Sequence, residues 1–497
     1  MTRFRKTASF ALAVTMIMTI SACDESTSQG ISSPASTLPA STTTTVAVTT
    51  TDPDENAATD EKIRDVNNTE YAPSGNAGTV KFLGYNDIRN RNTEVYSIFT
   101  SEQYGGEIEY ISSASGDAYF EKLGVLIASG DSPDCTTYEW QSYPYGLKRN
   151  LYEPLDEYVN LESPIWEGIA HLAEDFVYEG KHYYYPYQTI TNFAINYNRK
   201  AVIEAGLTDP YDLYLQNNWT WDTFRDLCVE WCNIDDEKIG YAGTHAMSFV
   251  ATTGVPLIDV RKDGTIVNNI NDPNLARAMQ FASTLYRDGL VYQNEFVDWL
   301  SPQLWAKNSD RVLFYGMNPD WVYSEAASAV QNLKGVENDI CGVVSDFAFV
   351  PFPRDPSSET YTIAYDTFGY MVPKGAKNIE GAIDWIHLNR IYEIDEEVRA
   401  TARDRAINPE PVYYIEGKYE GMRKWQLVWD PELYDLWIDM KDPTKFNFVF
   451  EDCNGFDSEL ITAKDKLFGG PLFDGDSWTQ LSEEYAPVIE AMINEYR

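Results

Sequence analysis

Short apolar segments alternate with amphipathic segments from Thr79 to the end of the chain, and this alternation is typical of an α/β fold. Residues 80–83 and 108–111 have the pattern of strands. Apolar residues at helical spacing predict helices over residues 117–129 and 378–391. We find no internal repeat and no second low-complexity segment in this part of the chain, so we expect lobes that share chain crossings.

The charge balance of the chain limits its partners. There are 38 Lys and Arg residues against 77 Asp and Glu residues, a formal net charge of −39. This balance argues against nucleic acid, because binding there requires basic groups that displace counterions from phosphates. It argues equally against an anionic membrane surface as the main partner of the folded part. Aromatic residues make up 14% of the chain, about half of them Tyr, and this composition favours binding of neutral, polar molecules.

The first 22 residues have the features of an export signal. A positive start at residues 3–6 precedes an apolar run over residues 8–20. That run is shorter than the roughly 20 residues needed to span a bilayer stably. Residues 20–23 read ISAC and resemble the lipobox of bacterial lipoproteins, in which the cysteine, here Cys23, is acylated. Ordinary secretory cleavage that leaves a free Cys23 is the alternative.

Residues 23–78 have the composition of a disordered tether. Ser, Thr, Ala and Pro make up most of residues 26–51, and such a segment cannot bury enough apolar surface to offset its ordering entropy. A flexible chain of this length spans roughly 40 Å. We therefore expect an exported protein, anchored to the outer face of the cell membrane by lipid on Cys23.

Several short phrases occur in a set order along the chain. They are LIASGDSPD at 126–134, GKHYYYP at 180–186, INYNRK at 195–200, EAGL at 204–207, WTWDTF at 219–224, GMNPDW at 316–321 and GYMVPKGAKN at 369–378. In this order they resemble the family one extracellular solute-binding proteins, the maltodextrin-binding-protein-like receptors of ABC importers. The resemblance covers about residues 80–390. The lipobox fits it, because an importer receptor must stay near its permease.

The resemblance implies a two-lobed α/β fold of the periplasmic-binding-protein type II, with hinge crossings and a central ligand cleft. By that analogy, residues 79–190 and 347–390 form lobe one, and residues 191–346 and 391–497 form lobe two. Residues 195–197 would be a crossing strand. The resemblance also implies a monomer that binds a carbohydrate by closing its lobes and passes it unchanged to the permease subunits, without a cofactor.

Loops that follow strands line the crevice in open α/β sheets, and they supply the candidate ligand contacts of lobe one. Tyr85, Asn86 and Asp87 follow the first predicted strand. The resemblance places Tyr138, Trp140 and Gln141 among sugar-binding side chains, and Gln188, before the crossing strand, and Asp366 are further candidates. A polar turn is the alternative reading of residues 85–87. Core packing is the alternative for Trp140, which the resemblance places among sugar-binding aromatic side chains.

In lobe two, Trp321 is the expected stacking ring, with Asp320 beside it. A sugar presents a face of C–H groups and a rim of hydroxyls. An aromatic ring can cover the face while carboxylates or amides bind the rim. Trp299 and Trp305 are weaker candidates, for which packing is the expected role.

No residue pattern identifies a catalytic, metal or cofactor site. The four His residues are scattered, and no pair has the spacing of metal ligands on one helix face. There is no Gly-x-Ser-x-Gly motif and no Gly-rich phosphate loop. So many carboxylates are present that a glycosidase cannot be dismissed by counting them. An extracellular polysaccharide-active enzyme is therefore kept as an alternative, as is a surface glycan adhesin or sensor of similar fold.

Five cysteines besides Cys23 cannot all pair within one chain, because their number is odd. They are Cys135, Cys228, Cys232, Cys341 and Cys453. A helix beginning near Thr220 places Cys228 and Cys232 one turn apart. Their Cβ atoms would be about 5–6 Å apart, whereas a disulfide needs about 3.8 Å. We expect these two not to bridge each other, and long-range pairs stay open.

Overall fold

A computed structural model describes most of the chain after residue 70. The described residues are 71–190, 193–235, 237–243, 247–292, 301–323, 343–344, 346–413, 415, 420–421, 426–450 and 458–495. The expected signal, Cys23 and most of the expected tether lie outside these residues. Trp299, Cys341 and Cys453 lie outside them as well.

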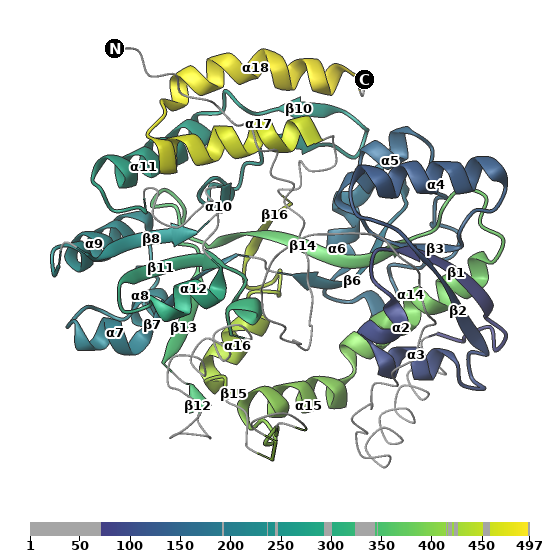
Figure 1. The fold of residues 1–497 in the computed structure, drawn as a ribbon. Coiled ribbons are helices and arrows are strands. Elements are labelled where there is room, and N and C mark those ends of the chain that lie inside the picture. Colours follow the sequence, from purple (N-terminus) through teal and green to yellow (C-terminus); the bar gives the residue numbers. More distant parts are fainter. Residues whose placement is uncertain are drawn as a thin grey trace, which may run out of the picture. The chain divides into compact units, whose positions relative to one another are not determined.

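A six-stranded sheet contains the first predicted strands (Figure 1). Its strands are β1 (Gly78–Gly84), β2 (Gly106–Ser112), β3 (Cys135–Thr137), β6 (Tyr185–Ile190), β14 (Thr362–Met371) and β16 (Asn447–Phe450). The order is β16-β14-β3-β1-β2, and β6 also pairs with β14. β1 is parallel to β2 and β3, while β14 is antiparallel to β3 and β6.

A four-stranded sheet follows the first crossing of the chain. It has the order β13-β7-β11-β8, from β13 (Phe347–Pro351), β7 (Ala194–Asn198), β11 (Val312–Met317) and β8 (Ile239–Gly243). β13 had been expected among the segments of lobe one, but it pairs with β7 through five residue pairs in this second sheet. β13 lies at the edge of this sheet, yet all five of its residues are buried. The chain returns to the six-stranded sheet only at β14.

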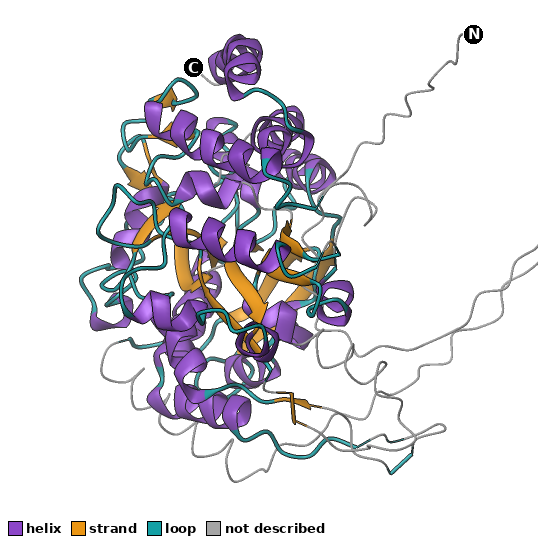
Figure 2. Ribbon diagram, turned by 90° about the vertical axis from the view of Figure 1, so that its left-hand side faces the viewer, coloured by secondary structure: helices purple, strands orange, loops and turns teal. Residues whose placement is uncertain are grey.

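Helices flank the strands of both sheets (Figure 2). The predicted helices are present as α4 (Asp117–Ser129) and α14 (Ile379–Ile394), and the helix near Thr220 is α9 (Trp221–Cys232). The others are α2 (Ile88–Arg91), α3 (Thr93–Phe99), α5 (Tyr145–Lys148), α6 (Ala170–Ala173), α7 (Arg199–Glu204), α8 (Pro210–Leu215), α10 (Met247–Ala251), α11 (Pro273–Arg287), α12 (Pro302–Lys307), α15 (Glu396–Ile407), α16 (Pro431–Asp439), α17 (Ser458–Gly469) and α18 (Trp478–Glu495). Among the described residues, no helix combines the length and the apolar composition needed to cross a membrane.

Short elements complete the fold. Three two-stranded sheets pair β4 (Val177–Tyr178) with β5 (Lys181–His182), β9 (Ile258–Val260) with β10 (Ile266–Asn268), and β12 (Val343–Val344) with β15 (Gln426–Leu427). Single helical turns lie at η1 (Trp140–Ser142), η2 (Pro164–Trp166), η3 (Glu174–Phe176) and the π-helical η5 (Gly470–Asp474).

Two groups of core residues lie along β14. Ile363, near its start, packs in the core around the four-stranded sheet. Tyr365 and Tyr370 pack in a core of the six-stranded sheet that also contains Val80 and Phe82 of β1. One strand therefore contributes to the cores of both sheets. The mixture of parallel pairs, covering helices and two cores confirms the predicted α/β class.

The segment that follows the undescribed N-terminal residues is fastened to α14. Asp384 is 1% exposed, and its carboxylate accepts hydrogen bonds from the Tyr71 hydroxyl at 2.5 Å and the Ser74 hydroxyl at 2.6 Å. The Tyr71 ring also stacks on His387, with centroids 3.9 Å apart. Residues 71–74 are thus held by a buried carboxylate and a ring contact, both from one helix.

The described cysteines are free thiols. Cys135 and Cys228 are buried and Cys232 is half-buried. Burial raises the pKa of each thiol, for Cys232 to about 11, so these groups are unreactive as thiolates at neutral pH. The expectation that Cys228 and Cys232 do not bridge each other is confirmed.

Candidate functional site

Three strands of the six-stranded sheet end toward the same edge. β1 is parallel to β3, and both β3 and β6 are antiparallel to β14, so β1, β3 and β6 share one direction. β14 passes this edge at Asp366, which pairs with Ile190, the last residue of β6. Residues that follow β1 and β3 are therefore brought toward Asp366, as the sequence predicts for a site at strand ends.

Tyr85, Glu139 and Asp366 lie within electrostatic reach of one another. Burial raises the pKa of Tyr85 to about 12, and the charges of Glu139 and Asp366 add to that rise. The structure thus brings together two predicted residues, Tyr85 and Asp366. The third member of the group, Glu139, stands between the predicted Tyr138 and Trp140 in the sequence.

Glu139 is a buried carboxyl group with incomplete hydrogen bonding. The residue is 3% exposed, and its Oε2 atom has no hydrogen-bond partner among the described residues. Burial, together with the charge of Asp366, raises the pKa of Glu139 to about 7, although a backbone hydrogen bond from Gly116 acts in the opposite direction. Close to neutral pH, this group can therefore carry a proton and act as a hydrogen-bond donor.

Glu139→Gln should remove a pH dependence of stability. The folded chain holds a proton on Glu139 up to about pH 7, whereas the ordinary pKa is 4.5, so the folded state binds more protons between these values. Stability from this group is present below about pH 4.5 and is lost as pH rises through 7. We expect the wild type to lose about 2 kcal/mol relative to the variant between pH 5 and pH 8. Urea unfolding of both proteins at the two pH values measures this, and parallel curves would contradict it.

A stack of rings lies beside these carboxyl groups. Phe368, two residues beyond Asp366 in β14, stacks on Tyr187 of β6 with centroids 6.3 Å apart and planes 18° apart. Tyr187 stacks in turn on Tyr370 at 5.4 Å. The guanidinium carbon of Arg91, the last residue of α2, lies 4.3 Å from the centroid of Phe368.

The other end of this arrangement is Gln188. Its side-chain amide donates to Glu393 Oε1 of α14 at 3.0 Å. Burial raises the pKa of Glu393, and the nearby cation Lys441 opposes that rise. We call the set Tyr85, Arg91, Glu139, Tyr187, Gln188, Asp366, Phe368 and Glu393 the candidate site.

Asp320 is linked to the candidate site through Lys441 and Tyr434. The Asp320 side chain is accessible to solvent. The protein atoms around it nevertheless disfavour the charged carboxylate and raise its pKa, while the positive charge of Lys441 lowers it. Lys441 has the same influence on Glu393, and its ammonium lies 4.4 Å from the Trp437 ring centroid. Burial raises the pKa of Tyr434, as do the charges of Asp320 and Glu393. Predicted residues Gln188 and Asp320 therefore approach a common group of charges.

Other predicted residues have local roles. Asp87 caps α2 and pairs with Arg89 at 2.7 Å, which favours the polar-turn reading. Tyr138 packs against Phe176 and Tyr184.

The remaining candidates of lobe one are Gln141, Trp140 and Asn86. Gln141 is 2% exposed and donates to Asp117 at 3.0 Å. The side chain of Trp140 lies outside the described part of the structure. Asn86, in the turn after β1, is half-buried.

The two described tryptophans expected in lobe two have different surroundings. Trp321 is half-buried beside the core of the four-stranded sheet, and its backbone N–H donates to Asn318 at 3.2 Å. Trp305 is fully buried and stacks on Tyr315 at 5.4 Å. Trp305 is thus a packing residue, as expected.

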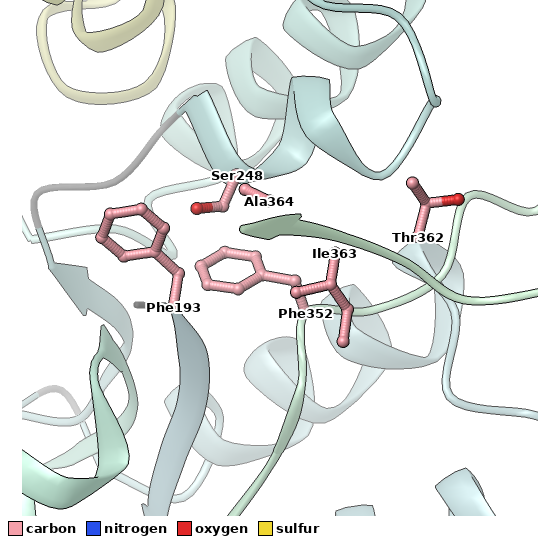
Figure 3. A pocket seen from close by; sticks show the side chains of 6 residues that line it. All are labelled: Phe193, Ser248, Phe352, Thr362, Ile363 and Ala364. Carbon is pink, nitrogen blue, oxygen red and sulfur yellow. The ribbon is translucent and has the colours of Figure 1, made fainter. Parts of the chain in front are cut away.

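The chain crosses between the sheets beside a narrow internal space. Figure 3 shows the side chains that line it, among them Phe193 before β7, Phe352 after β13 and Ile363 of β14. The space has no room for a water molecule, so these residues form a packing contact at the crossing and not a ligand pocket.

Sequence analysis missed Arg91, Tyr187, Phe368 and Glu393. Phe368 had a usable signal, because it stands two positions from Asp366 on the same face of a strand. Glu393 ends a helix far from the other segments in the sequence, and nothing local marks it. Within the described ranges, no group of three or more His, Cys, Asp or Glu side chains is arranged to hold a metal ion.

Comparisons with known proteins agree with this architecture. The family model for bacterial extracellular solute-binding proteins matches residues 87–388, more than half of the chain. No curated protein sequence matches the chain.

Solved structures share the fold at low sequence identity. The sugar-binding protein MalE from Xanthomonas citri has a TM-score of 0.58 and 14% identity, covering 84% of this chain and 98% of that one. The GacH receptor of Streptomyces glaucescens, solved unliganded and with acarbose, has a TM-score of 0.56 and 15% identity, covering 84% and 99%. The ABC substrate-binding protein Lmo0181 from Listeria monocytogenes, in complex with cycloalternan, has a TM-score of 0.54 and 14% identity, covering 83% and 99%. These likenesses confirm the predicted type of fold.

Proposed function

This chain belongs to the bacterial extracellular solute-binding proteins, and from that membership we propose that it binds a carbohydrate outside the cell for uptake by an ABC importer. The ligands named for MalE, GacH and Lmo0181 support a carbohydrate as the class of solute. The observation that carries the proposal is the candidate site, where stacked rings and carboxyl groups meet at the ends of β1, β3 and β6.

The chemistry of the candidate site suits a sugar. Tyr187 and Phe368 are half-buried, so part of each ring remains as apolar surface for the C–H groups of a pyranose. Glu139, Asp366 and Gln188 offer acceptors and donors for its hydroxyls. A site that leaves hydroxyls unpaired on closing would bind poorly, so a sugar receptor needs both kinds of side chain.

The two sheets support a division into two lobes that differs at one boundary from the expected one. In this proposal lobe one contains residues 79–190 and 362–390 together with β16, which pairs with β14, and lobe two contains residues 193–351 and the other C-terminal segments. The basis is the pairing of β13 with β7 and the return of the chain at β14. The crossings beside Phe193 and Phe352 would be the hinge, and closure of the lobes would be the signal read by the permease.

The proposed function includes export and a lipid anchor. Residues 1–22 would direct export, Cys23 would carry the lipid, and the Ser/Thr-rich tether would hold a monomeric receptor near the permease subunits. The support is the sequence pattern and the extracellular family.

Calorimetry and thermal unfolding of the purified chain test the proposal. A sugar at a hundredfold excess over its Kd should stabilise the protein by about 2.7 kcal/mol. Phe368→Ala should weaken binding about tenfold, because one stacking ring contributes about 1 kcal/mol beyond its buried area. Stabilisation by peptides or polyamines and by no sugar would refute the carbohydrate while leaving a solute receptor.

A separate measurement addresses the enzymatic alternative. We expect no release of reducing ends when the protein is incubated with polysaccharides, because the proposed role is to hand on the ligand unchanged. Release that is abolished by Glu139→Gln or Asp366→Asn would show a glycosidase instead.

A further inference from the structure

Arg91 is an exposed arginine without a polar partner in the described part of the chain. It forms no hydrogen bond or ion pair there, and its ring contact is with Phe368. Acidic residues outnumber basic ones two to one, and other arginines use them: Arg277 pairs with Asp355 and Arg403 with Asp435. The hydrogen-bond donors of Arg91 are thus available in a chain where acceptors are plentiful.

The guanidinium of Arg91 is nevertheless held in place. Its carbon lies 4.3 Å from the centroid of Phe368, which itself stacks on Tyr187. Burial raises the pKa of Tyr85 and of Tyr187, and in both the charge of Arg91 opposes the rise. Arg91 therefore lies among the rings of the candidate site, close to the phenols of Tyr85, which follows β1, and Tyr187, which lies within β6.

We propose that Arg91 is a specificity-determining residue, whose guanidinium donates two parallel hydrogen bonds to adjacent hydroxyls of the bound sugar. This inference rests on the proposed carbohydrate function and names the group that selects among sugars. A planar guanidinium presents paired N–H groups in a fixed geometry, which a lysine ammonium cannot reproduce.

The surrounding charges select a neutral ligand over an anionic one. The charges of Glu139 and Asp366 raise the pKa of the Tyr85 phenol, whereas the charge of Arg91 lowers it. A ligand carboxylate at Arg91 would therefore also meet two carboxyl groups of the protein. Neutral hydroxyls accept from the guanidinium without that repulsion.

Paired changes in protein and ligand test the role of Arg91. The probes are maltose, maltotetraose, cellobiose and xylobiose, and the tightest binder is compared with its single-deoxy analogues by calorimetry. Arg91→Met should weaken binding at least tenfold, and Arg91→Lys nearly as much. For the wild type, one deoxy analogue should bind at least tenfold more weakly than the parent sugar. For Arg91→Met, this analogue and the parent sugar should bind with equal affinity, because the variant has already lost the donor for that hydroxyl.

Arg149 supplies a matched control. Its guanidinium carbon lies 4.4 Å from the Tyr145 ring centroid, it is exposed, and it is not part of the candidate site. Arg149→Met should leave sugar affinity unchanged, and neither Met variant should shift the melting temperature of the free protein.

The outcomes separate this inference from the proposed function. If the wild type binds none of the four sugars, the proposed function fails and the inference fails with it. If it binds a sugar and Arg91→Met binds it equally well, the inference alone is overturned. Full affinity in Arg91→Lys, or equal losses for every deoxy analogue in both proteins, would also overturn it.

Discussion

Arg390→Met is expected to lower the free energy of unfolding by about 4 kcal/mol. Arg390 of α14 is 5% exposed and donates to three backbone carbonyls: Ile165 at 2.8 Å, Glu167 at 2.8 Å and Tyr187 at 3.0 Å. The variant leaves these oxygens without that donor in a buried place, and each such loss costs about 1–3 kcal/mol. Burial lowers the pKa of Arg390 to about 10, which shows that the buried cation is itself unfavourable. Removing this cation in the variant therefore offsets part of the lost stability.

Arg405→Met is the control for this prediction. Arg405 is exposed at the end of α15, and no hydrogen bond or ion pair joins it to a described residue. The same change of side chain should alter stability by less than about 0.5 kcal/mol. Urea unfolding of the three proteins gives the comparison, and similar losses in both variants would show that the three carbonyl contacts of Arg390 contribute little.

Gly369→Ala is expected to cost about 3 kcal/mol of stability, because β14 has no room for a methyl group there. A Cβ atom at Gly369 would lie 2.5 Å from the backbone carbonyl oxygen of Tyr185 and still closer to the Tyr184 ring. The position is also where the pairing of β14 with β6 shifts register. Backbone of a paired strand cannot move aside without breaking the ladder, so the strain stays in the folded state.

Gly124→Ala provides the matching change in open space. Gly124 lies within α4, and a Cβ atom built there has no neighbour within 4 Å. The substitution should raise stability by up to about 1 kcal/mol, since alanine is the better helix former. Thermal unfolding of both variants measures the contrast. A loss in Gly369→Ala no larger than the change in Gly124→Ala would refute the steric account.

Local patterns were enough to predict individual elements. Alternating apolar residues give β1 and β2, and helical spacing of Phe120 and Leu123 gives α4, with Gly130 in the left-handed conformation at its end. These signals lie within a dozen neighbouring residues, and the structure follows them. The order of the short phrases then predicted the type of fold, which no single element could have done.

The candidate site depends on contacts between distant segments, which local patterns do not encode. Tyr85 was predicted from its position after a strand, and Asp366 was a candidate with no element assigned to it. Their meeting with Glu139 depends on how β1, β3 and β14 pair. Arg91 of α2 meets the ring of Phe368 in β14, a residue far from it in the sequence. Residues 347–351 were expected in lobe one, and the pairing of β13 with β7 is likewise a contact between distant segments.

The attachment of residues 71–74 to Asp384 has a mechanical consequence. Tension on the preceding segment would load the hydrogen bonds from Tyr71 and Ser74 and pass directly into α14. Two turns along that helix, Arg390 holds the carbonyl of Tyr187. A pull from the N-terminal side would therefore reach the strand that carries Tyr187 through a single rigid rod, without first peeling away the edge of a sheet.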